Sequence, residues 1–193
     1  LLKLLLDDGG VQAGIYSRSY RLFDAGNNIS NLFAVFLLPM FASTIAKKES
    51  LNELVKSSFS LIVAMTGIIA IMCVFYSDEI MRLMYKPEFQ ETEAAYLQRI
   101  DSYATIFPLL MGSFFCLSTT YVFGTLLTAN GSLKQLNIVA ASGVIINILL
   151  NLIFIPMFKA VGAACTSLCV QALTATLQYI ISKRILKFEL GGK

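Results

Sequence analysis

The 193-residue sequence contains no histidine and no tryptophan, and only 14% of its residues are charged. Without histidine it cannot form a Ser-His or Cys-His nucleophile pair. A metal site would depend on its four cysteines, which we interpret as packing residues within helices. The sequence also lacks a GxxxxGK[ST] phosphate loop. Because soluble domains average about 25% charged residues, this scarcity argues against a cytosolic enzyme or a nucleic-acid-binding module.

Apolar residues are abundant instead, at 56% of the sequence, with a mean hydropathy of +0.72. A helix needs about 20 mainly apolar residues to cross a bilayer. Five runs meet that length and predict membrane spans at about residues 11–46, 57–77, 103–128, 135–157 and 160–182. The predicted fold class is therefore an all-α polytopic membrane protein, a helical bundle. Because the chain opens inside an apolar run without methionine, we expect residues 1–193 to be a single transmembrane domain from a longer protein.

The few basic residues are unevenly distributed among the predicted connections. Short loops rich in Lys and Arg tend to stay in the cytoplasm. The connections at 47–56 and 134, together with the tail after 182, hold eight basic residues, whereas the loop 78–101 and Lys159 hold four. This asymmetry predicts a cytoplasmic C-terminal tail, with 7–10, 78–101 and Lys159 on the outer side.

The first predicted span carries a polar stripe, defined as Ser17, Arg21, Asp24, Asn28 and Asn31. Their spacing of i, i+4, i+7, i+11 and i+14 places them on one face of a helix. Ionisable groups inside a membrane are costly, so they usually face a bundle interior or a wet cavity. The stripe therefore predicts one wall of a hydrated cavity.

Two arginines make this wall a candidate anion site, because the planar guanidinium binds phosphate bidentately and stays charged. Asp24 can pair with Arg21 three residues earlier, which would leave Arg18, beside the stripe, as unbalanced positive charge. An alternative for Arg18 is a simple anchor whose side chain reaches the lipid headgroups.

Two later spans also carry polar residues at helical spacing. They are Asn147 and Asn151 in the fourth span, and Ser167, Gln171, Thr174 and Gln178 in the fifth. Such residues often form hydrogen bonds between membrane helices. They would equally suit a water-filled lumen that admits sugars.

Four motifs in chain order resemble a known transporter family. They are Gly14-Ile15-Tyr16 with Tyr20-Arg21-Leu22 and Leu38-Pro39; Leu83-Met84-Tyr85-Lys86-Pro87-Glu88-Phe89; Thr128-Ala129-Asn130-Gly131 with Lys134-Gln135; and Asn147, Asn151, Ile155-Pro156 and Gly162-Ala163-Ala164. Together they resemble the polysaccharide flippases, which export O-antigen and other lipid-linked oligosaccharides, within the MATE-like transporter superfamily. Lys86 and Lys159 stand where that family often has glycine.

The resemblance implies two six-helix lobes, of which this chain would be most of the C-terminal lobe, without the N-terminal lobe. It implies a flippase in the bacterial cytoplasmic membrane, not an enzyme. By alternating access it would move polyprenyl-diphosphate-linked oligosaccharide from the inner to the outer leaflet. The partners implied are that substrate, membrane lipids and glycan-polymerising machinery, with no nucleic acid. No cofactor is expected, although Na⁺ or H⁺ is a candidate coupling ion. The expected substrate-binding residues are Arg18, Arg21, Asp24, Asn28, Asn147, Asn151, Gln171 and Gln178.

Three alternatives remain at this stage. A cation-coupled multidrug or metabolite antiporter of the same superfamily should favour acidic cavity residues, yet Asp24 is the only acid within a predicted span. A membrane enzyme acting on lipid-linked glycans would need paired carboxylates; Glu88, Glu91 and Glu93 instead read as a solvated helix face. A non-transporting scaffold would keep the polar stripe dry.

Overall fold

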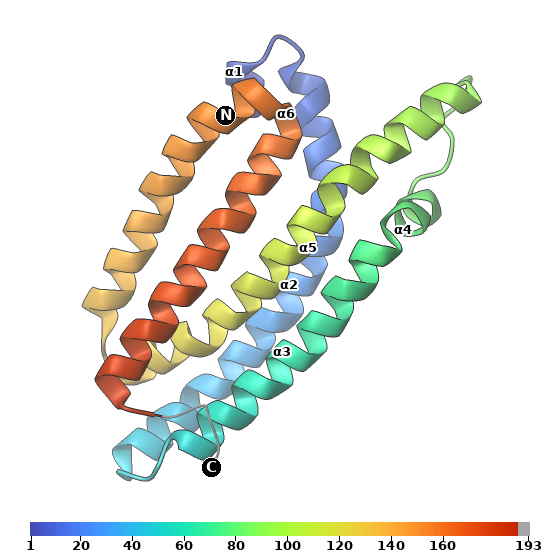
Figure 1. The fold of residues 1–193 in the computed structure, drawn as a ribbon. Coiled ribbons are helices and arrows are strands. Elements are labelled where there is room, and N and C mark those ends of the chain that lie inside the picture. Colours follow the sequence, from blue (N-terminus) through green and yellow to red (C-terminus); the bar gives the residue numbers. More distant parts are fainter. Residues whose placement is uncertain (189–193) are drawn as a thin grey trace.

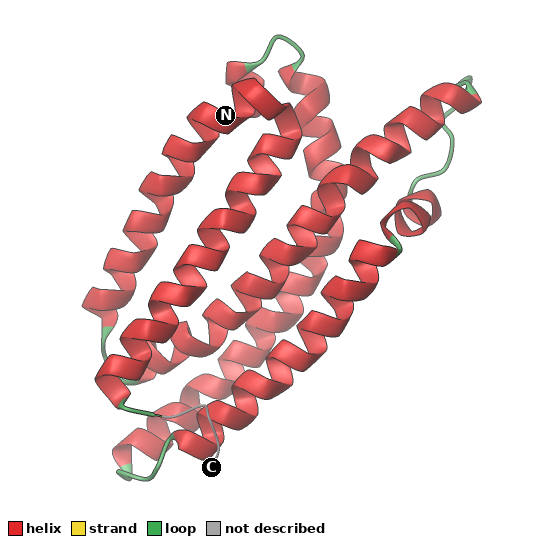
Figure 2. Ribbon diagram, viewed as in Figure 1, coloured by secondary structure: helices red, strands yellow, loops and turns green. Residues whose placement is uncertain are grey.

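The computed structural model describes residues 1–188, and it is built from helices joined by short connections (Figures 1 and 2). The helices are α1 (Leu2–Leu5), α2 (Gly9–Ala46), α3 (Asn52–Phe75), α4 (Ser77–Met84), α5 (Glu93–Ala129) and α6 (Leu133–Leu186). No strand occurs within residues 1–188. Four helices, α2, α3, α5 and α6, are long and apolar enough to cross a membrane. The prediction of an all-α polytopic membrane protein is confirmed.

The longest helix, α6, folds back on itself at Lys159. Its 54 residues form two antiparallel arms, which we call the first arm (133–158) and the second arm (160–186) (Figure 1). Lys159 has φ 53° and ψ −131°, a backbone conformation that glycine adopts far more readily. Gly162 is required at the turn, because a Cβ there would lie 2.2 Å from the Phe154 carbonyl oxygen. With the two arms of α6 counted separately, residues 1–188 make five passes through the bundle.

The centre of the bundle is α5, which packs against α2, α3, α4 and α6 (Figure 1). Its buried side chains form the middle of two apolar clusters, one around Tyr103 and Phe107 and the other around Phe123. A Cβ on Gly26 of α2 would lie 2.9 Å from the Phe114 ring of α5, so glycine allows this close approach. Most other helices thus rest on α5, and their outer faces are left open.

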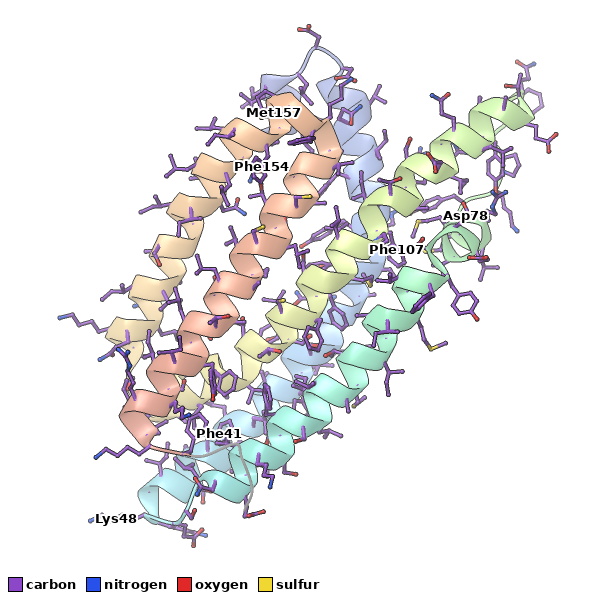
Figure 3. The ribbon with its side chains drawn as sticks, in the orientation of Figure 1. Phe41, Lys48, Asp78, Phe107, Phe154 and Met157 are labelled. Atoms are coloured by element: carbon purple, nitrogen blue, oxygen red, sulfur yellow. The ribbon has the colours of Figure 1, made fainter. Side chains whose placement is uncertain are left out.

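The connections gather at two opposite ends of the bundle. Figure 3 shows Met157, beside the α6 turn, at one end and Lys48, between α2 and α3, at the other. Lys159 Nζ lies 2.8 Å from Asp8 Oδ2, which joins the α6 turn to the start of α2. This pair and a hydrogen bond from Gln12 hold the pKa of Asp8 below its usual value. We call this the outer end, following the predicted sidedness, which stays a prediction. Lys193, counted with the basic tail, lies outside the described residues.

One predicted boundary shifts considerably at the outer end. The third span was expected from about residue 103, but α5 begins at Glu93 and its first turns project beyond the bundle beside α4 (Figure 1). Thr92 caps this helix, and its hydroxyl accepts a hydrogen bond from the Ala95 amide at 3.3 Å. Arg99 and the charges near it therefore lie on the outer extension of α5, which is continuous with the apolar part of the same helix.

Candidate functional site

The polar stripe lies on an uncovered face of α2. Ser17, Arg21, Asp24, Asn28 and Asn31 are all exposed in the described chain. The side of α2 that packs in the bundle is instead lined by residues such as Phe23, Ser30, Ala34 and Leu37, all buried. The Ser30 and Ser118 hydroxyls are 2.8 Å apart, which joins α2 to α5 on that packed side. No other helix of residues 1–188 covers the stripe.

A second uncovered face of the same helix has the opposite chemistry. Ile29, Leu32 and Phe36 are 66%, 60% and 71% exposed. Such a face suits contact with lipid chains. A face bearing Arg21 and Asp24 does not, because intramembrane charges are stabilised by water or by polar protein groups. The two faces of α2 therefore require different surroundings, and the polar one requires water or polar protein groups.

The stripe continues into a groove between α2, α5 and the second arm, with a volume of about 300 Å³. Polar residues on its wall are Asn31, Thr120, Tyr121, Thr125, Thr128 and Gln178. The Tyr121 hydroxyl donates to Asn27 Oδ1 at 2.8 Å. Gln178 is 4% exposed, and its Oε1 has no hydrogen-bond partner within the described chain. A buried amide oxygen of this kind needs a partner such as water or a ligand.

Arg18 points away from the stripe. Its Nη1 donates to the Tyr103 hydroxyl at 2.5 Å and lies 3.3 Å from Glu88 Oε1. The stripe itself then carries one positive and one negative side chain. Arg21 and Asp24 form no ion pair within 4 Å, either with each other or with another described residue. The predicted net positive charge of the stripe is therefore not found, because Arg18 is neutralised by a carboxylate from a distant loop.

Comparison with known families identifies the class of protein to which this chain belongs. The family model described as "Lipid II flippase MurJ" matches residues 5–192. The chain belongs to the lipid II flippase family. No curated protein matches it. Membership confirms the resemblance at the level of lipid-linked precursor flippases of the MATE-like superfamily, in the bacterial inner membrane, and favours a transporter over a catalyst. Export of O-antigen in particular stays a prediction.

Within this member of the flippase family, the remaining predicted site residues are dispersed. Asn151 is buried on the first arm and donates from Nδ2 to Asn147 Oδ1 at 2.9 Å. Gly143, on the same face two turns earlier, packs against Thr174 of the second arm. The hydrogen bond between Asn147 and Asn151 lies within the first arm, and Asn151 Oδ1 has no hydrogen-bond partner among residues 1–188.

The residues of the second arm have different neighbours. Gln178 lies beside the groove that Asn31 lines, whereas Gln171, two turns earlier, is half-buried. Ser167 Oγ lies 3.2 Å from the Tyr16 hydroxyl and joins the arm to α2. The structure therefore brings Gln178 to the end of the stripe, but not Asn147 or Asn151.

A charged cluster at the outer end was missed by the sequence analysis. Arg99 donates to both Glu91 carboxylate oxygens, at 2.7 and 2.6 Å, and the two side chains are only 16% and 13% exposed. The hydrogen bonds from Arg99 hold the pKa of Glu91 below its usual value. The expectation of a solvated face was wrong for Glu91, although Glu93 is exposed. Only the i, i+8 separation of opposite charges could have suggested the pair.

Proposed function

We propose that this chain provides a substrate-facing wall of a flippase for lipid II-type precursors, in which a polyprenyl diphosphate carries a sugar-containing head. The observation that carries the proposal is the uncovered polar stripe of α2, beside an equally uncovered apolar face of the same helix. The family match supports the class of substrate. In the two-lobe arrangement that the resemblance implies, the stripe would face the cavity between the lobes.

The chemistry of such a head explains why a polar wall is needed. Moving an ionised phosphate from water into a low-dielectric medium is very costly. Fixed donors on the protein can replace the lost hydration. Arg21 is exposed on the stripe and unpaired within the described chain, so its guanidinium is free to bind a diphosphate bidentately. Amides such as Asn28 and Asn31 would contact sugar hydroxyls.

Asp24 gives the same wall a second role. It lies three residues after Arg21 and is exposed without an ion-pair partner among residues 1–188. It would either orient Arg21 when the substrate is bound or hold the coupling ion, Na⁺ or H⁺. Rocking of the two lobes would then expose the wall first to the cytoplasmic side, where we place the basic tail, and then to the outer side.

The test is a leaflet-resolved flipping assay with the full-length protein in proteoliposomes containing lipid II. Arg21→Ala should lower the flipping rate about tenfold or more, because a charge-assisted hydrogen bond is worth about 1.5–3 kcal/mol. Arg82→Ala is the matched control, because Arg82 pairs with Asp78 on α4, away from the stripe. Its rate should stay within about twofold of wild type. Wild-type flipping by well-folded Arg21→Ala protein would overturn the proposal.

The same assay separates the two substrate classes. Lipid II and an O-antigen precursor on the same polyprenyl diphosphate carrier would be presented in parallel vesicles. Faster flipping of lipid II is expected from the family match. Selective flipping of the O-antigen precursor would favour the polysaccharide exporters that the motifs resemble.

A further inference from the structure

Two arginines from different helices converge on one carboxylate oxygen at the outer end. Glu88 Oε1 lies 3.3 Å from Nη1 of Arg18 on α2 and 3.6 Å from Nη1 of Arg99 on α5. The Cζ atoms of both arginines lie within 6 Å of the Tyr103 ring centroid, at 5.8 and 5.9 Å. Two like charges around one ring repel each other, so an anion between them is electrostatically favoured.

Both arginines are held in place by contacts that do not involve the Glu88 side chain. Arg18 is anchored by its hydrogen bond to the Tyr103 hydroxyl, and Tyr103 is 2% exposed. Arg99 is anchored by Glu91 and donates further to the Lys86 carbonyl oxygen at 3.2 Å. The pair of guanidinium groups would therefore remain assembled if Glu88 moved away.

Glu88 is held far more weakly than Glu91. Its side chain is 60% exposed, whereas that of Glu91 is 13% exposed and accepts two short hydrogen bonds from Arg99. Within residues 1–188, the Glu88 carboxylate contacts these two arginines through a single oxygen. Exposed ion pairs of this kind contribute little to stability, so a stronger anion can replace the carboxylate.

We infer that Arg18 and Arg99 form a second anion site, for a phosphate-class ligand, and that Glu88 occupies it when no ligand is bound. Once Glu88 leaves, the two arginines and Glu91 carry one net positive charge. The adjoining cavity, about 540 Å³, is also lined by Gln98, whose side-chain amide can donate to further oxygens. Because Arg18 is one helical turn from Arg21, a diphosphate head that leaves the stripe would meet this site next. Only that assignment of the ligand to the lipid head rests on the proposed function.

The direct test uses inorganic pyrophosphate and the full-length protein in nanodiscs, with binding measured by titration calorimetry. Glu88→Gln removes the competing charge and should tighten pyrophosphate binding at least about fivefold. Glu93→Gln is the matched control, because Glu93 is an exposed acid at the same end with no described ion pair. Its affinity should match wild type. Equal affinities in the two variants, whether changed or not, would overturn the inference.

A second pair of variants tests the arginine directly. Arg18→Gln in the Glu88→Gln background should abolish the gained affinity, whereas Arg82→Gln in that background should keep it. Arg18→Lys, which retains the charge, should recover part of the binding and shows that the loss is not one of folding. Retained affinity in the Arg18→Gln double variant would also overturn the site.

A competition experiment distinguishes a lipid head group from a soluble phosphate compound as the ligand. Glu88→Gln protein would be titrated with pyrophosphate in nanodiscs with and without polyprenyl diphosphate. Weaker pyrophosphate binding in the presence of the lipid supports a lipid head as the ligand. Unchanged binding supports the same site with a soluble phosphate compound. Because the flipping rate of Arg21→Ala is measured separately, failure of the proposed function and failure of this site give different results.

Discussion

Arg21 and Arg18 are one helical turn apart on α2, yet their surroundings are opposite. Arg18 is bonded to a buried tyrosine and a carboxylate that come from 85 and 70 residues away in sequence. Arg21 is exposed and makes no described ion pair. The outer end is thus a cluster of satisfied charges that fixes helices to each other, whereas the stripe keeps its charges available. The same residue type is partnered within the chain in one place and open to a ligand in the other.

The largest expected effect is on stability, and it should differ between an arginine of the outer end and one of the stripe. Arg99→Ala leaves the Glu91 carboxylate without its two hydrogen bonds and should clearly lower the free energy of unfolding. Arg21→Ala removes an exposed side chain and should change it by less than about 0.5 kcal/mol. Equilibrium unfolding of the detergent-solubilised full-length protein measures both. Adding Glu91→Gln to Arg99→Ala should recover part of the loss; equal losses in the two single variants would contradict the comparison.

The second prediction concerns water at the stripe. A cysteine at Asn28 should react with a membrane-impermeant maleimide about tenfold faster than one at Ile29, because thiolate reactivity requires hydration. Both positions are exposed and adjacent, so the difference reports the surroundings of the two α2 faces. Labelling of the parent protein, with its four native cysteines, is subtracted. Equal rates would mean that the stripe is dry, as in a scaffold.

The third prediction concerns the backbone strain at Lys159, in the turn between the two arms of α6. Lys159→Gly relieves a positive-φ conformation that costs a non-glycine residue about 1–3 kcal/mol. It also removes the half-exposed ion pair with Asp8, which contributes little to stability because both side chains are solvated. A net gain in unfolding free energy of about 1 kcal/mol is expected. Lys159→Ala, which loses the pair but keeps the strain, should be slightly less stable than wild type.

The smallest effect is a dependence on pH. The pKa of Glu91 is lowered from its usual 4.5 by the hydrogen bonds from Arg99, so the folded state favours the ionised form. The resulting stabilisation is fully present above pH 4.5 and is lost as the pH falls through the lower folded-state pKa. The melting temperature of wild type should therefore fall more steeply than that of Glu91→Gln between pH 5 and about pH 3. Parallel curves would show that the pair contributes nothing.

The sequence predicted those parts of this site that depend on a single helix. The stripe follows from the 3.6-residue period, and all five residues share the expected face. The reversal at Lys159 follows from two apolar runs separated by one charge. The partners of Arg18 could not be predicted, because Tyr103 comes from α5 and Glu88 from the 85–92 loop, and no local pattern encodes how either packs against α2.

The packing of one helix against another also explains why Asn147 and Asn151 do not lie beside the stripe, contrary to expectation. Asn147, Asn151 and Gln178 all occur at helical spacing within apolar spans, so the sequence gives no way to distinguish them. Only the packing of the two α6 arms decides that Asn151 turns inward while Gln178 reaches the groove beside Asn31. Intrahelical geometry is therefore predictable here, and rotation of one helix about another is not.

The central position of α5 has a mechanical consequence. Because α2, α3 and α6 all rest on this one helix, and Gly26 brings α2 into tight contact with Phe114, the lobe is expected to tilt as one piece. Arg18 and Arg21 would then travel together during each cycle at constant spacing. Tilting would then change the side of the membrane to which both arginines are open. The helices that carry them would not need to rearrange relative to each other.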